Sequence, residues 1–246
     1  MNDLLPWVLS WALATLRFVP IFMLGAMTPF AWAPGQIRVV FVLVLGALLV
    51  STLSQPFVGH QFALAAATEL LQGGCIGLAV MLPMAALANA AKLLDVQAGL
   101  ASATLFNPAV QGTDSLFGTL FSLTGTQIFF SLGFDLLVLR ALVASGRIAP
   151  VAGMARLPDP SAILSLFGAQ FVLGLMVVAP VVLGLFAVDL GVAYASKSMP
   201  QANVYFLALP VKTAMAFALL AVTVQTAPAL VGRLFSDALA RVGGTP

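Results

Sequence analysis

Six long apolar stretches, separated by short links rich in proline, glycine and polar residues, dominate this chain. They cover residues 4–25, 37–53, 62–82, 119–139, 162–189 and 205–231. A helix needs about 20 residues to cross a hydrocarbon core of about 30 Å, so most of these stretches are long enough to span a membrane. The pattern predicts an all-α membrane protein with about six hydrophobic segments, arranged as bent helical hairpins that Pro and Gly interrupt. We predict a single integral membrane domain over residues 1–246.

The link between the last two apolar stretches concentrates polar groups that lipid cannot satisfy. It carries Gln201, Asn203 and Lys212 together with Pro200 and Pro210. Each proline lacks a backbone N–H and disfavours helix in the residue before it, so we expect the helices to break there. A break at membrane depth persists only where protein or water covers it. The three polar side chains are therefore expected to face protein partners or a wet cavity. Alternatively, the lysine snorkels to the membrane interface and the amides cap the next helix.

Two further charges lie inside apolar stretches. Arg17 interrupts the first stretch, and Glu69 lies in the third, one helical turn before Gly73. Gly73 and Gly77 are four residues apart on that same helix face, which favours close approach of a second helix. We therefore expect Glu69 to lie at a helix contact and to pair with Arg17 or Arg38. Proton transport is the less favoured alternative, because no chain of acidic residues follows Glu69.

A polar loop over residues 99–118 keeps several large apolar side chains. Leu105, Phe106, Leu116 and Phe117 lie among glycines, serines, threonines and a proline. A loop in water seldom exposes so much apolar area. The loop is therefore expected either to pack back onto the helices or to insert into a cavity that partner subunits form.

Composition supports the membrane assignment and removes several functional classes. The chain is 61% hydrophobic and 7% charged, with one cysteine, one histidine and a net charge of +2. Its mean hydropathy is +1.10. These values exclude an internal disulfide and give no support to a metal site or to nucleic-acid binding. Nucleotide-binding loops, metalloprotease motifs and nucleophile elbows are absent from the sequence, so we expect no enzymatic activity and no cofactor.

Several separated motifs together resemble one known family, the FliR/SctT family of type III export-gate proteins. The motifs are Arg17-Phe-Val-Pro-Ile-Phe, Ala33-Pro-Gly-Gln-Ile-Arg38, Glu69 with Gly73 and Gly77, Gln97-Ala-Gly99 with Phe106-Asn107-Pro108, and Pro200-Gln-Ala-Asn-Val-Tyr205 with Pro210-Val-Lys212. They follow one another over nearly the whole chain. The last pair of motifs is the most specific. The chain departs from the family pattern at Asn107, where the family often has Asp, and at Ala208-Leu209, where it often has glycine.

The resemblance implies a channel subunit of a protein export apparatus in the bacterial inner membrane, in the flagellar basal body. It further implies assembly with FliP-type and FliQ-type membrane subunits, with FlhB-type and FlhA-type export components nearby and unfolded proteins as substrates. By the same resemblance, a pore or plug loop would comprise Leu105, Phe106, Asn107, Pro108, Leu116 and Phe117. Arg17, Arg38, Glu69, Gln201, Asn203 and Lys212 would be buried or interface polar residues. An injectisome export subunit is the alternative, and a small-molecule secondary transporter or a structural anchor is the more distant one.

Overall fold

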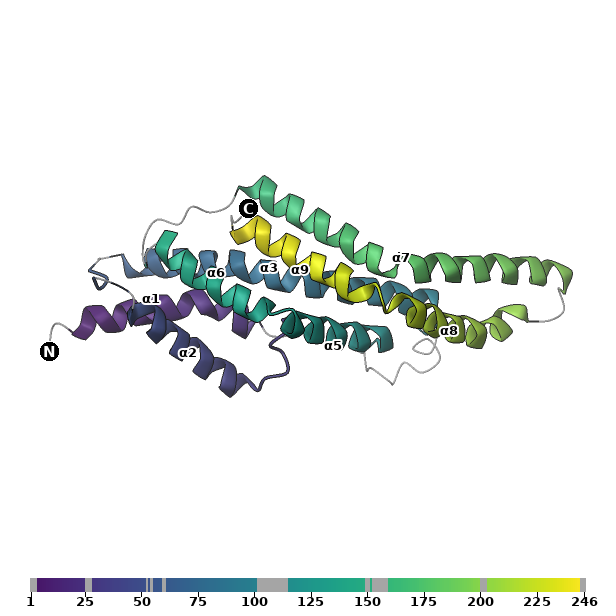
Figure 1. Ribbon diagram of the computed structural model, residues 1–246, viewed down its shortest axis with the longest axis horizontal. Helices are drawn as coiled ribbons and strands as arrows, with labels where there is room; N and C mark the ends of the chain where they lie inside the picture. Colours follow the sequence, from purple (N-terminus) through teal and green to yellow (C-terminus); the bar gives the residue numbers. More distant parts are fainter. Residues whose placement is uncertain are drawn as a thin grey trace. The chain divides into compact units, whose positions relative to one another are not determined.

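The computed structural model describes residues 4–24, 28–51, 53, 55–58, 61–100, 115–148, 151, 159–199 and 203–243, and every regular element among them is a helix. The helices are α1 Leu4–Met23, α2 Gly35–Ser51, α3 Phe62–Gln97, α5 Leu116–Ser131, α6 Phe134–Ile148, α7 Pro160–Ser198, α8 Val204–Thr223 and α9 Ala227–Gly243 (Figure 1). Four of them, α1, α3, α7 and α8, are long and apolar enough to cross a membrane. Helices α5 and α6 make up a fifth candidate span, bent by 66° at the break between them. These features confirm the predicted class of an all-α membrane protein.

Two of the predicted segments are broken where the sequence suggested continuity. The fourth stretch breaks at Gly133, whose φ of 71° lies in the left-handed region that glycine adopts without strain. The sixth stretch ends as a helix at Thr223 and resumes as α9 at Ala227. In between, the hydroxyl of Thr226 donates to the Thr223 carbonyl at 2.9 Å. The same kind of contact occurs inside continuous helices, at Thr68 and Ser145, so it accompanies the interruption and does not by itself cause it.

The prolines, by contrast, break fewer helices than predicted. The break expected at Pro210 is wrong, because Pro210 lies inside α8. Pro83 and Pro180 likewise lie inside α3 and α7, which run on for 36 and 39 residues. A proline removes one backbone hydrogen bond, and the neighbouring turns keep theirs. Between the end of α7 at Ser198 and the start of α8 at Val204, the structure describes Met199 and Asn203.

The start of α7 follows a standard helix signal. Asp159 precedes the helix and Pro160 occupies its first position, where the missing N–H costs nothing. The backbone N–H of Ser161 donates to Asp159 Oδ1 at 3.2 Å. Hydrogen bonds from the side chain and then the backbone of Ser161 lower the pKa of Asp159 below its ordinary value.

The described helices divide into two compact units. The first unit comprises Met1–Met84, Phe129–Gly168 and Phe235–Pro246, and the second comprises Ala85–Ile128 and Ala169–Leu234. Helices α3, α5, α7 and α9 each contribute residues to both units. The single domain stays a prediction.

An aromatic cluster occupies the core of the first unit. The ring of Phe30 lies 4.8 Å from that of Phe22 and 5.8 Å from that of Phe129. Phe129 in turn packs on Phe134 and Phe235, at 6.1 and 5.1 Å between ring centroids. Such edge and offset contacts add about 0.5–1.5 kcal/mol per pair to the burial of apolar area. The cluster thereby joins α1, α5, α6 and α9 within this unit.

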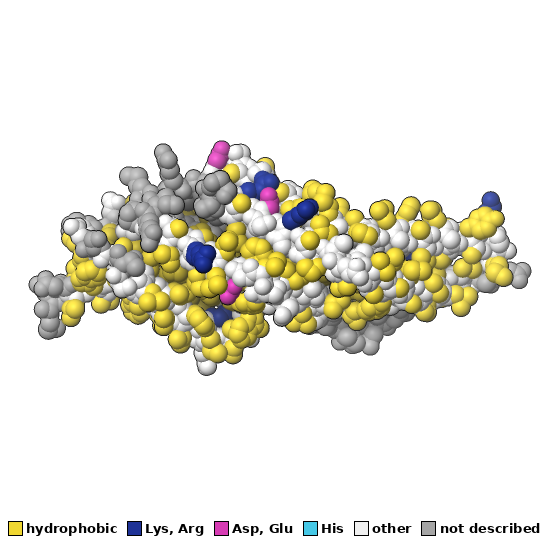
Figure 2. Space-filling view, viewed as in Figure 1, with side chains coloured by type: hydrophobic (Ala, Val, Ile, Leu, Met, Phe, Trp, Pro, Cys, Tyr) yellow, Lys and Arg dark blue, Asp and Glu magenta, His cyan; other side chains and the backbone are white. Residues whose placement is uncertain are grey.

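The second unit buries an aliphatic core. Its fully buried side chains include Leu87 and Leu94 of α3, Val181 and Leu185 of α7, and Ala216 of α8. Much apolar surface remains uncovered. Yellow hydrophobic side chains are spread over the visible described face, with few charged ones among them (Figure 2). In a chain of this composition, such surface is expected to meet lipid or protein.

Gly73 and Gly77 both face α1, but only one of them lies too close to it for a larger residue. A Cβ at position 73 would lie 2.7 Å from the carbonyl carbon of Arg17. A Cβ at position 77 would lie 3.6 Å from Pro20, an ordinary van der Waals distance. Gly73 therefore sets how closely α1 and α3 approach each other, and Gly77 fits that spacing without requiring it.

We predict that Gly73→Ala destabilises the folded protein by about 1–3 kcal/mol, the usual cost of overpacking against backbone that cannot move aside. Gly77→Ala is the matched control, since both changes give the same gain of about 1 kcal/mol in helix propensity. The measurement is the thermal unfolding midpoint of the detergent-solubilised protein. Equal midpoints for the two variants would contradict the interpretation.

Candidate functional site

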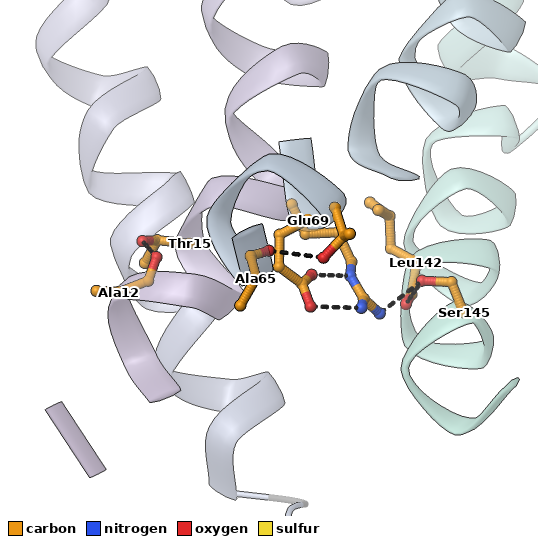
Figure 3. Close-up of polar contacts among 8 residues, drawn as sticks. Ala12, Thr15, Ala65, Glu69, Leu142 and Ser145 are labelled. Atoms are coloured by element: carbon orange, nitrogen blue, oxygen red, sulfur yellow. Dashed lines mark hydrogen bonds and ion pairs between the residues drawn. The ribbon is translucent and has the colours of Figure 1, made fainter. Parts of the chain in front are cut away.

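A fully buried ion pair lies at the centre of the first unit. Arg17 Nε donates to Glu69 Oε2 at 2.6 Å, and Arg17 Nη2 donates to Glu69 Oε1 at 3.1 Å. Both side chains are 0% exposed. The remaining terminal nitrogen, Nη1, donates to the hydroxyl of Ser145 on α6 at 3.2 Å. Figure 3 shows the two parallel contacts to Glu69 and the third contact to Ser145. The cluster thus ties α1, α3 and α6 together.

Small residues next to the pair allow its geometry. Gly73, one turn along α3 from Glu69, leaves room for the Arg17 backbone. A Cβ on Gly146 of α6 would lie 2.9 Å from Leu49 and 3.8 Å from Arg17 Nη1. A bidentate guanidinium–carboxylate contact of this kind satisfies several donors at once, which a buried charge requires.

The other arginine proposed for Glu69 has a different role. Arg38 Nε donates to the Ala33 carbonyl at 2.8 Å, so it holds the turn that leads into α2. Of the two candidate partners, the structure places Arg17 against Glu69.

A second polar cluster lies within the second unit, where Asp189 of α7 contacts two other helices. Lys212 of α8 forms an ion pair with Asp189 Oδ1. Gln97, at the end of α3, donates from Nε2 to Asp189 Oδ2 at 2.9 Å. Lys212 is 12% exposed and Asp189 33% exposed, so solvent or neighbouring groups reach this cluster more easily than they reach Glu69. We call these three residues the Asp189 cluster. Lys212 thus finds its counter-charge within the chain.

The remaining predicted site residues fall into two groups. Asn203 occupies the N-cap position of α8, yet its side chain makes no capping hydrogen bond and is exposed. Leu116 is 51% exposed, whereas Phe117 is fully buried, with its ring 5.3 Å from that of Phe217. Gln201 and the loop residues Leu105, Phe106, Asn107 and Pro108 lie outside the described residues.

Sequence reasoning missed several residues that complete these clusters. Asp189 is an acid near the end of an apolar stretch, so the argument that singled out Glu69 applies to it equally. Gln97 and Ser145 are uncharged, and no spacing signal connects them to residues 92 and 128 positions away. Asp95, which is 6% exposed and belongs to neither cluster, likewise has no sequence signal beyond its charge.

The described residues offer little for small-molecule chemistry. Within them, no group of three or more His, Cys, Asp or Glu side chains could hold a metal ion. A hollow of about 300 Å³ along α2 is lined by Gln36, Ile37, Val40, Phe41 and Val44. With one amide and no charge, that lining cannot recognise an ionic substrate. Both polar clusters instead neutralise charges between helices.

Comparison with known proteins gives this helical arrangement a family. Residues 8–238 match the model of the bacterial export proteins, family 1. The chain belongs to this family. It is 26% identical over 243 residues to the flagellar biosynthetic protein FliR of Bacillus subtilis, covering 96% of this chain and 94% of that protein. It is 29% identical over 178 residues to FliR of Aquifex aeolicus, covering 72% and 69%. It is also 32% identical over 157 residues to the Yop proteins translocation protein T of Yersinia pestis, covering 63% and 60%.

Membership of this export family fixes the broad role of the chain. As a member of the FliR/SctT family, it is a component of a type III export apparatus and a membrane protein. The resemblance derived from the motifs is thereby confirmed. Flagellar and injectisome relatives both match, so the branch is a separate question.

We predict that Glu69→Leu destabilises the first unit by about 3–5 kcal/mol, because Arg17 would keep a buried charge without its carboxylate. Arg17→Met combined with Glu69→Leu should recover part of that loss, since it removes both charges. The measurement is the thermal midpoint and the yield of folded protein in detergent.

Arg241→Ala provides the control for these variants. It breaks a surface pair with Asp237 in which the two side chains are 42% and 31% exposed, so we expect a change of about 1 kcal/mol or less. The pairing is contradicted if the thermal midpoint of the double variant is no higher than that of Glu69→Leu. It is also contradicted if Glu69→Leu has the same midpoint as Arg241→Ala.

Proposed function

We propose that this chain is the core export-gate subunit of a flagellar type III export apparatus in the bacterial inner membrane. In this role it assembles with FliP-type and FliQ-type subunits into a channel. FlhB-type and FlhA-type components lie close by, and unfolded flagellar proteins pass through. An injectisome export subunit is the alternative. The family assignment leaves no support for a small-molecule transporter.

The extent of the match carries the flagellar proposal. The alignment covers 94% of the Bacillus subtilis flagellar protein but 60% of the Yersinia pestis translocation protein. Identity is higher over the shorter match, at 32% against 26%, so coverage and identity favour different branches. Coverage weighs more here, because it includes the α8 and α9 region as well as the amino-terminal helices.

The surface of the helices supports assembly into a larger complex. The apolar stretch of α7 is 28% buried within the chain, and that of α8 is 11% buried. Phe171 and Leu183 of α7 and Leu207 and Val211 of α8 are among the exposed apolar side chains. Helices that carry so much uncovered apolar surface need lipid or helical partners, and an export channel supplies both.

Charge pairing inside the chain also suits a channel subunit. Asp189 and Lys212 neutralise each other between α7 and α8. A neutral pair can lie against partner helices at a lower cost than two separate charges. The expectation that Gln201, Asn203 and Lys212 face partner subunits accordingly remains part of this proposal.

We predict that a tagged copy of the chain, purified in mild detergent from its native membrane, brings FliP-type and FliQ-type subunits with it. Mass spectrometry of the purified material is the measurement. Deleting the gene should abolish motility and the secretion of flagellar proteins. Loss of effector secretion with normal motility would favour the injectisome alternative, and purification without any export subunit would overturn the proposal.

The loop from Leu105 to Phe117 is proposed to help close the resting channel. Its described end offers Leu116 for contacts outside the chain, because Phe117 is already buried against Phe217. We predict that deleting residues 105–108 raises ion conductance through membranes that contain the assembled complex. Replacing the exposed Leu123 of α5 by Ala is the control. Unchanged conductance with the complex intact would assign the loop to surface packing.

A further inference from the structure

One residue of α3 contacts the chain on both sides of the connection from α3 to α5. The backbone carbonyl of Asp95 accepts a hydrogen bond from the Leu100 N–H at 2.9 Å. Its carboxylate Oδ1 accepts from the Phe117 N–H at 3.3 Å, and its Oδ2 accepts from the Ser115 hydroxyl. The carboxylate of Asp95 therefore joins the start of α5 to the last turn of α3, beside the turn at Leu100 that its backbone carbonyl closes.

The contact on the amino-terminal side belongs to a well-formed helix end. Gly99 adopts a φ of 81°, and its N–H donates to the Val96 carbonyl at 3.1 Å. Together with the bond from Leu100 to Asp95, this is a Schellman motif, which satisfies the last carbonyls of the helix. The Thr213 hydroxyl of α8 lies 3.2 Å from the Ala98 carbonyl and can donate to it, which adds a second attachment at the same turn.

The contact on the carboxy-terminal side is a helix cap with an added charge. Ser115 Oγ accepts from the Gly118 N–H at 2.7 Å, which is the ordinary contact of a capping serine. Asp95 adds a carboxylate from another helix to the same first turn, where the helix dipole favours negative charge. This carboxylate is 6% exposed, so its desolvation has to be offset by the hydrogen bonds that it accepts.

We propose that Asp95 is a positioning residue for protein export: its carboxylate fixes the start of α5 against the last turn of α3, and export depends on the spacing of these two helices. The proposal rests on the proposed function. The role proposed for Asp95 differs in one respect from that of an ordinary helix cap. If Asp95 only stabilised α5, removing Ser115 Oγ would have the same effect as removing the carboxylate. If the carboxylate also holds α5 against α3, losing it is more damaging, because removing Ser115 Oγ leaves the contact from the Phe117 N–H in place.

The test compares Asp95→Ala, Asp95→Asn and Ser115→Ala with the control Lys92→Ala. Lys92 is exposed and lies one turn before Asp95 on the same helix. Each variant is made in a background with Cys75→Ala, purified as the assembled complex, and spin-labelled at positions 93 and 123. Leu93 and Leu123 are exposed on α3 and α5. The distance distribution between the labels reports the spacing, and secretion of flagellar proteins by the same strains reports function.

We expect the distance distribution of Asp95→Ala to be at least about twice as wide as that of Lys92→Ala. We expect its export to fall about tenfold or more, the size associated with one charge-assisted hydrogen bond. Asp95→Asn keeps one acceptor oxygen and should lie between the two. Ser115→Ala loses the cap to Gly118 and one of the two contacts to Asp95 but keeps the contact from the Phe117 N–H, so its distance distribution should be narrower and its export higher than those of Asp95→Ala.

Several outcomes would overturn the inference. They are an Asp95→Ala distribution as narrow as the control, export equal to the control, or equal effects of Asp95→Ala and Ser115→Ala. If Asp95→Ala does not accumulate, the same comparison with Asp95→Asn decides the matter. Failure of the unaltered chain to purify with export subunits overturns the proposed function instead, so the two failures are distinguishable.

Discussion

The need to neutralise charge inside apolar helices governs this structure. Arg17 and Glu69 are fully buried in the first unit, where an isolated charge would cost several kcal/mol. The bidentate contact offsets that cost only if α1 and α3 lie close together and in register. Gly73 provides the close approach, and Ser145 binds the third nitrogen. One interaction thus fixes the relative placement of three helices.

Two acidic side chains of the second unit are likewise paired or hydrogen-bonded. Asp189 receives contacts from both Lys212 and Gln97, and Asp95 receives two hydrogen bonds from the start of α5. Of these residues, Asp95 and Gln97 lie near the end of α3, where the chain leaves the helix at Gly99. Polar contacts therefore gather where the backbone turns, and apolar packing holds the rest of the helices. That division is expected when most of the surface is apolar and turns alone expose backbone groups.

Several prolines lie inside helices without ending them. Pro83 and Pro180 lie inside helices of 36 and 39 residues, and Pro210 lies inside α8. The helices are interrupted instead at Gly133, which adopts a positive φ, and between Thr223 and Ala227. Helices α3 and α7 contribute residues to both compact units, as do the shorter α5 and α9. An export component that must hold several partners benefits from elements that are this long and continuous.

The sequence by itself determined the class of fold, the family and the need for partners at Arg17, Glu69 and Lys212. Those conclusions rest on quantities that are local or cumulative along the chain, namely hydropathy, motif order and the cost of charge in apolar segments. The tertiary structure decided which partners were chosen. Glu69 pairs with Arg17 and not with Arg38, and Lys212 pairs with Asp189. Asp95 caps a helix that begins beyond a long connection. Sequence separation carries no information about such contacts, because they depend on which helix faces meet after packing. The tertiary structure also decided that helices continue through proline. They do so because the turns next to each proline keep their hydrogen bonds.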